Sequence, residues 1–98
     1  MLNDYVTSLI QDYISNVDPF TVKNIEYLEE YIMISNETPA TEDFLYADAV
    51  YYLYNVTDTN DNSHYFILVV NENLQMVIKA TDEVLADLFP HILKKNDV

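Results

Sequence analysis

The apolar residues at the start of the chain repeat with the period of a helix. Between Leu2 and Ile14 they recur at the i, i+3, i+4 spacing that gives a helix one apolar face. This pattern predicts a first helix near residues 2 to 16. Pro19 limits it, because the residue before a proline avoids helical backbone.

A similar spacing predicts a second helix near residues 25 to 33. Ile25, Leu28 and Ile32 fall on one helical face, and Asn24 is a residue type that caps helices. The residues just before it, Phe20 to Lys23, are expected to form a short strand.

The second half of the chain has the pattern of strands. Residues 44–56 are rich in Tyr and Val and predict a strand, with a bend near Asp48 left open because thirteen residues is long for one strand. Residues 64–71 and 74–80, separated by a short polar link, predict a hairpin. The polar residues 57–63 predict a turn between strands.

The chain ends on a third predicted helix, which starts at about residue 82. Thr81 is placed to cap it, and Pro90 is expected to kink or end it. Consecutive strands with short links favour an antiparallel sheet. We therefore expect residues 1–98 to form a single α+β domain, with about four to five antiparallel strands and two to three helices.

Charge is the strongest signal of the composition. The 98 residues contain 17 Asp and Glu against 4 Lys and no Arg, a formal net charge of −13. Such a field repels nucleic acid and accelerates association with a basic protein surface. The absence of Cys and of any long apolar run indicates a cytoplasmic protein rather than a disulfide-bonded or membrane-spanning one.

The residues offer little support for catalysis or for a cofactor. Nucleophile elbows and phosphate-binding loops need Gly, which the chain lacks. The run from Asp58 to Asn62 resembles the start of a calcium loop, but Ser63 and Val69 stand where that loop needs Gly and Glu. His64 and His91 have no second ligand at a metal-binding spacing. We expect no enzyme activity, no cofactor and no metal.

Glu26, Glu29 and Glu30 are the most specific charged cluster. On a helix, residues three and four apart lie about 5–6 Å from each other, a spacing close enough to that of neighbouring phosphates to imitate a DNA strand. Like charges four apart also destabilise a helix slightly, which suggests a use other than stability. The alternative is an ordinary solvated helix face.

At this point the chain resembles the Ugi-type inhibitors of uracil-DNA glycosylase, small acidic proteins that mimic DNA. The likeness covers nearly the whole chain. It is carried by the segment from Phe20 to Ile32, which matches a strand-to-helix junction of that family, by the hairpin from His64 to Ile78, and by a final helix with an internal Pro90.

The resemblance implies which residues bind. Glu26, Glu29 and Glu30 would stand in for DNA phosphates. An apolar pocket between the second helix and the sheet would receive a hydrophobic side chain of the enzyme, lined by Ile25, Leu28, Ile32, Met76 and Ile78. Lys23 and Asn24 occupy junction positions where the family has Glu and Ser, so Lys23 reverses a charge at a family contact.

The expected function is therefore a DNA-mimic inhibitor of uracil-DNA glycosylase, bound in the DNA-binding cleft of that enzyme. Lys23 favours an alternative, the inhibition of another DNA-binding enzyme such as a restriction or CRISPR nuclease. A third possibility is an immunity or antitoxin protein that neutralises a basic nuclease. Each of these functions has a basic DNA-handling protein as the partner, with no direct contact to nucleic acid or membrane.

Overall fold

The structure is a computed structural model that describes residues 4–17, 19–33, 49–71 and 74–95. In chain order, its elements are helix α1 (Asp4–Val17), strands β1 (Val22–Met33), β2 (Ala49–Asp58), β3 (Ser63–Asn71) and β4 (Leu74–Lys79), and helices α2 (Asp82–Leu88) and α3 (Pro90–Lys95). None of the described helices is long and apolar enough to cross a membrane.

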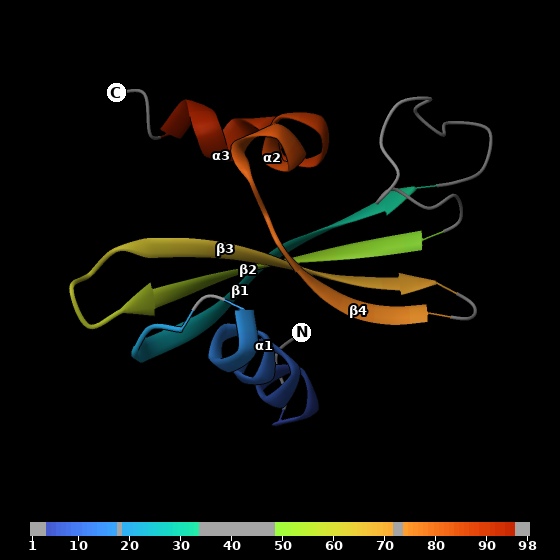
Figure 1. The fold of residues 1–98 in the computed structure, drawn as a ribbon. Helices are drawn as coiled ribbons and strands as arrows, with labels where there is room; N and C mark the ends of the chain where they lie inside the picture. Colours follow the sequence, from blue (N-terminus) through green and yellow to red (C-terminus); the bar gives the residue numbers. More distant parts are fainter. Residues whose placement is uncertain (1–3, 18, 34–48, 72–73, 96–98) are drawn as a thin grey trace.

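The four strands form one antiparallel sheet in the order β1-β2-β3-β4. Every strand pairs with its neighbour in sequence (Figure 1). The predicted α+β class and antiparallel sheet are confirmed. So is the predicted hairpin, which is formed by β3 and β4.

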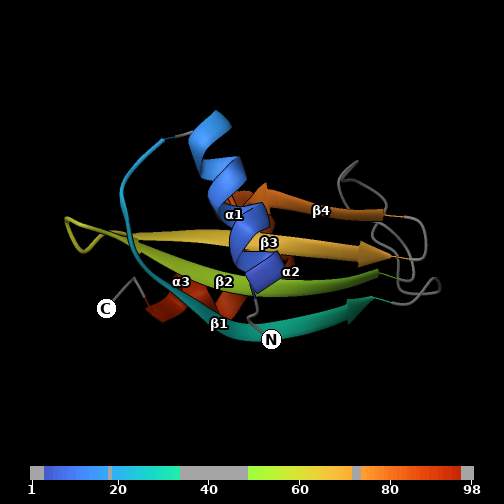
Figure 2. The same cartoon turned by 90° about the horizontal axis from the view of Figure 1, so that it is seen from below.

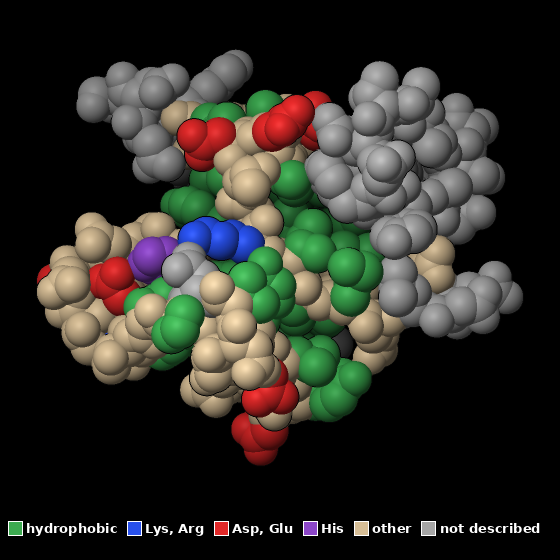
Figure 3. Space-filling view, viewed as in Figure 1, with side chains coloured by type: hydrophobic (Ala, Val, Ile, Leu, Met, Phe, Trp, Pro, Cys, Tyr) green, Lys and Arg blue, Asp and Glu red, His purple; other side chains and the backbone are tan. Residues whose placement is uncertain are grey.

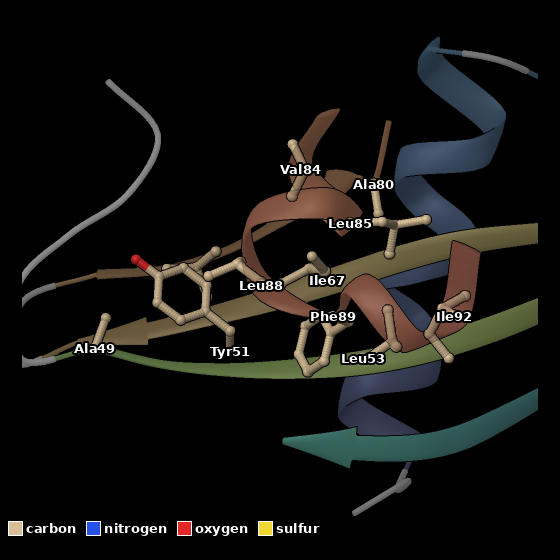
Figure 4. Close-up of a cluster of buried hydrophobic side chains, with 11 residues drawn as sticks. Ala49, Tyr51, Leu53, Ile67, Ala80, Val84, Leu85, Leu88, Phe89 and Ile92 are labelled. Atoms are coloured by element: carbon tan, nitrogen blue, oxygen red, sulfur yellow. The ribbon is translucent and has the colours of Figure 1, made fainter. Parts of the chain in front are cut away.

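The helices cover both faces of the sheet. Helices α2 and α3 lie on one face and α1 lies on the other, as the two perpendicular views show (Figures 1 and 2). Alternate residues of β2 and β3 point to opposite faces, so each strand contributes to two separate apolar cores. The core under α2 and α3 contains Tyr51, Leu53, Ile67, Leu85 and Phe89 (Figure 4). The core under α1 contains Ile10, Tyr54, Val56, Phe66 and Leu68.

Helix α1 is the helix that the apolar spacing predicts. Its buried residues are Val6, Ile10 and Ile14, each four positions from the next, so they form one stripe against the sheet. The helix ends at Val17, two residues before Pro19, as expected.

The predicted C-terminal helix is also confirmed, as two short helices. The Thr81 hydroxyl oxygen accepts a hydrogen bond from the Val84 amide at 3.3 Å, which caps α2. Phe89 leaves the helical conformation and Pro90 starts α3. Proline suits this position because its missing N–H is not needed in the first turn.

The predicted second helix is wrong, because residues 25–33 belong to strand β1. This strand pairs with β2 from Val22 to Met33, and of the short strand expected at Phe20 to Lys23 only Val22 and Lys23 belong to it. Lys23 and Leu28 are extra residues at two breaks in the register of β1 with β2. Such a bulge turns the following side chains to the other face.

The bulge at Leu28 explains why the sequence pattern resembles a helix. Ile25 and Tyr27 contact the core under α1, whereas Leu28 and Tyr31 contact the core under α2 and α3. The extra residue interrupts the period of two and leaves apolar residues three and four apart. Pairing with the Tyr-rich strand β2 outweighs the helical preference of the segment.

The strand predicted over residues 44–56 is confirmed for its second part. Strand β2 runs without a break from Ala49 to Asp58. The preceding residues, including the possible bend at Asp48, lie outside the described ranges.

The phenol of Tyr54 generates a prediction about alkaline pH. Tyr54 is fully buried, and burial, followed by the nearby Tyr27 and Tyr52, raises its pKa from 10.0 to about 12. The folded protein thus holds this proton more tightly than the unfolded chain. Its contribution to stability is complete below pH 10 and is lost as the pH rises to about 12. The loss should be on the order of 2 kcal/mol.

The measurement is the free energy of unfolding by urea at several pH values from 9 to 12, for the wild type and for Tyr54→Phe. We expect the variant to lose less stability over this interval, because it has no phenol to ionise. Equal losses in the two proteins would contradict the assignment.

Candidate protein-interaction surface

The three glutamates of β1 lie on an edge strand of the sheet. In the described part of the chain, β1 pairs with β2 alone. Glu26 stands opposite Asn55 and Glu29 opposite Leu53, on the face covered by α2 and α3. Glu30 stands opposite Tyr52, which packs on the α1 side. The three carboxylates are therefore divided between two faces.

The expected row of carboxylates at helical spacing is therefore wrong. A strand rises about 3.3 Å per residue, which places Glu26 and Glu30 about 13 Å apart along β1. Both side chains are exposed. They mark the acidic edge strand, defined here as β1 with Glu26, Glu29 and Glu30, and they do not imitate consecutive phosphates.

Glu29 differs from its neighbours because it has a partner. Its Oε2 atom lies 2.6 Å from Nε2 of His91, and both side chains are partly exposed. This contact joins the edge strand to the first turn of α3. The Glu29 carboxylate thus helps to hold α3 against the sheet.

The apolar residues expected to line one pocket do not come together. Leu28, Met76 and Ile78 pack against the core under α2 and α3, while Ile25 contacts the core on the opposite face. Ile32 is 60% exposed on the α1 side.

The strand order explains this separation. Strands β1 and β4 are the two edges of the sheet, about 14 Å apart at three strand spacings of about 4.8 Å. The expected pocket is therefore wrong, and no pocket is found in the described part of the molecule.

Lys23 and Asn24 begin the acidic edge strand rather than a helix. Lys23 Nζ lies 2.6 Å from Oδ1 of Asp61, and both side chains are exposed. Asn24 is exposed and stands opposite Thr57. The positive charge of Lys23 is thus turned toward the β2–β3 turn, where an acidic neighbour neutralises it.

The β2–β3 turn is organised by the buried carboxylate of Asp58. Oδ1 accepts hydrogen bonds from the amides of Asn60, at 2.8 Å, and Asn62, at 3.0 Å. Oδ2 lies 2.8 Å from Nε2 of His64. Both carboxylate oxygens therefore make contacts within the turn and its flanking strand. The run from Asp58 to Asn62 connects the antiparallel strands β2 and β3 and is a hairpin turn, as predicted.

The same turn anchors the start of the acidic edge strand. The ring of His64 stacks on Phe20 with centroids 4.1 Å apart, and the Thr59 amide donates to the Thr21 carbonyl at 3.2 Å. Asp61 takes a positive φ of 64°, which Asp and Asn tolerate better than most residues. A chain without glycine can make the turn in this way.

The Asp58–His64 contact was not foreseen from the sequence. A sequence signal for it exists: Asp58 is followed by Asn two and four residues later, which is typical of an Asx turn, and by His64 six residues later. No group of three His, Asp or Glu side chains suited to a metal ion is found among the described residues.

Exposed carboxylates occur on α1, on β1, in the β2–β3 turn and on α2. Eight are exposed: Asp4, Asp12, Glu26, Glu30, Asp61, Asp82, Glu83 and Asp87. Lys23 forms an ion pair with one of them, Asp61. With 17 acidic residues against 4 lysines in the sequence, lysines can neutralise only a small part of the negative charge.

No known protein family, curated protein or solved structure matches this chain.

The Asp58 contacts generate a prediction about acid pH. The hydrogen bond to His64 and then that to the Asn62 amide hold the pKa of Asp58 below its ordinary value of 3.8. Its contribution to stability is present above that value and is lost as the pH falls through the lower pKa of the folded state. Asp58→Asn should therefore be less stable at neutral pH and less sensitive to acid.

Asp61→Asn is the matched control, because it makes the same charge change in the same turn and tolerates the positive φ. The measurement is the thermal midpoint between pH 2 and 7. We expect the control to follow the wild type closely. An Asp58→Asn curve that is parallel to the wild-type curve throughout would contradict the role of this carboxylate.

Proposed function

We propose that this protein is a non-enzymatic DNA mimic, which binds a basic DNA-binding enzyme and competes with DNA for its cleft. The observation that carries the proposal is the large excess of negative charge, much of it exposed. Exposed carboxylates occur on α1, on the acidic edge strand and on α2, and the chain carries a formal net charge of −13.

The physical basis is electrostatic competition. An enzyme that binds DNA presents Lys and Arg side chains to phosphates, and its affinity depends on neutralising them. A compact acidic protein is attracted to the same basic surface, and the attraction raises the association rate. No covalent chemistry is required, which agrees with the lack of a nucleophile or phosphate-binding motif in the sequence.

Uracil-DNA glycosylase is the first target to test, because the chain resembles the inhibitors of that enzyme. Two parts of the resemblance have no counterpart in the geometry: the segment from Phe20 to Ile32 is a strand, and the residues of the expected pocket lie apart. The geometry therefore supports the wider class of DNA-binding enzymes better than the glycosylase alone.

The protein should not bind duplex DNA itself. With a net charge of −13 it is repelled by a polyanion, so a gel-shift assay at physiological salt should show no complex. The same duplex should be released from the target enzyme when the protein is added. A shift of duplex DNA by the pure protein would refute the mimic proposal.

Charge reversal on the acidic edge strand should slow association with the target. For the pair Glu26→Lys and Glu30→Lys we expect an on-rate lower by roughly an order of magnitude at low salt, with a smaller change in the off-rate. The measurement is surface plasmon resonance with uracil-DNA glycosylase, then with restriction and CRISPR nucleases.

The matched control replaces the same two residues by Asp, which keeps the charge and should keep the on-rate. Raising the salt concentration should make the on-rates of the wild type and the charge-reversed variant similar, because screening removes long-range attraction. If both variants bind like the wild type at low salt, this strand does not face the enzyme. If DNA stays bound to every enzyme tested at a tenfold excess of the protein, the proposed function is wrong.

A further inference from the structure

Strand β4 is an edge strand of a different kind from β1. Its register with β3 runs without a break from Leu74 to Lys79, whereas β1 has two bulges. Bulges and charged side chains are the usual devices that prevent another strand from pairing with an edge. The acidic edge strand has both, while β4 has one charged residue, Lys79, at its end.

The backbone of β4 offers hydrogen-bonding groups to the outside. The Ala80 amide donates to the Tyr65 carbonyl at 2.8 Å, which makes this a hydrogen-bonded pair of the antiparallel ladder. Such pairs alternate along the strands, so Met76 and Ile78 bond to β3. The N–H and C=O groups of Gln75 and Val77 therefore point away from the sheet. In the described part of the chain, β3 is the one strand paired with β4.

The side chains around this edge are apolar at the centre and acidic above and below. Figure 3 shows hydrophobic side chains gathered over β4, between acidic side chains over α2 and others over α1. Met76, Val77 and Ile78 are only partly buried, although they pack against the two cores.

The acidic residues belong to the two helices that border the edge. Helix α1 is held beside β4 by the Tyr5 hydroxyl, which donates to Oε1 of Gln75 at 2.9 Å. The exposed carboxylates are Asp4 and Asp12 on α1, and Asp82, Glu83 and Asp87 on α2.

We propose that this edge binds an extended basic segment of the partner enzyme as a fifth strand. Backbone hydrogen bonds to Gln75 and Val77 would hold the segment, as in other cases where a peptide is added to a sheet. Alternate side chains of an added strand point to opposite faces. Lys or Arg side chains on the two faces would thus meet the acidic residues of α1 and of α2.

The negative charge of the protein favours a basic segment at this edge over a second copy of the chain. Pairing of two β4 strands would bring two molecules of net charge −13 together, with their acidic helices side by side. A basic segment is attracted where a second copy is repelled. The inference rests on the proposed function for the identity of the partner, but it concerns a different edge from the acidic edge strand.

The experiment uses a labelled synthetic peptide, Lys-Lys-Val-Val-Val-Lys-Lys, and a version in which the three valine amides are N-methylated. Both peptides have the same charge, but the second cannot donate those backbone hydrogen bonds. We expect the wild-type protein to bind the methylated peptide at least tenfold more weakly in fluorescence anisotropy. The amide NMR signals of Gln75 and Val77 should shift with the first peptide.

A variant tests the same edge from the protein side. Val77→Pro removes an outward N–H and leaves the pairing with β3, and proline is tolerated at edges in this orientation. The Val77→Pro variant should bind the unmethylated peptide at least tenfold more weakly than the wild type does. A thermal melting curve similar to that of the wild type would show that the variant is folded. Equal affinities for the two peptides, or an unchanged affinity in the variant, would overturn the inference. A concentration-dependent dimer in sedimentation, abolished by Val77→Pro, would also overturn it by assigning the edge to a second copy.

The two proposals fail separately. If the wild type displaces DNA from an enzyme and Val77→Pro does so equally well, the added strand is refuted and the proposed function stands. If DNA is never displaced, the proposed function is refuted whatever the peptides show.

Discussion

The pairing of β2 with β3 is the constraint on which the rest of the structure depends. Tyr51, Leu53, Tyr54, Ile67 and Val69 are fully buried, although they point to both faces of the sheet. A strand buried on both faces needs cover on both, which α1 supplies on one side and α2 with α3 on the other. Because apolar side chains fill both cores, the exposed acidic residues lie on the edge strand, in the β2–β3 turn and on helices α1 and α2.

The central pairing also explains which parts of the fold could be predicted from the sequence. Helix α1, the β3–β4 hairpin and the cap at Thr81 depend on local patterns, and each is found where its residues predict it. Strand β1 depends on a non-local pairing with β2 and carries a bulge at Leu28. The bulge makes the spacing of its apolar residues resemble that of a helix, so the local pattern predicts the wrong element.

The helix predicted near residues 25 to 33 also determines the geometry expected of the candidate site. Glu26, Glu29 and Glu30 are exposed or partly exposed, but the geometry expected of them depends on the predicted helix. On a strand they are divided between two faces, and Glu29 contacts His91, which is 62 positions away in the sequence. The partly buried Asp58–His64 contact depends on tertiary structure, and so does the contrast between the two sheet edges. The net charge, which needs no placement, is the part of the functional argument that the sequence supplies by itself.

The central claim is that the acidic surface occupies a site where a basic enzyme binds DNA. The most direct measurement is to capture binding proteins from a cell lysate on the immobilised protein and then to elute with excess duplex DNA at constant salt. We expect the captured proteins to bind DNA and to be released by the duplex, while an equal amount of a neutral polymer leaves them bound. Captured proteins that stay on the column in saturating duplex DNA would contradict it.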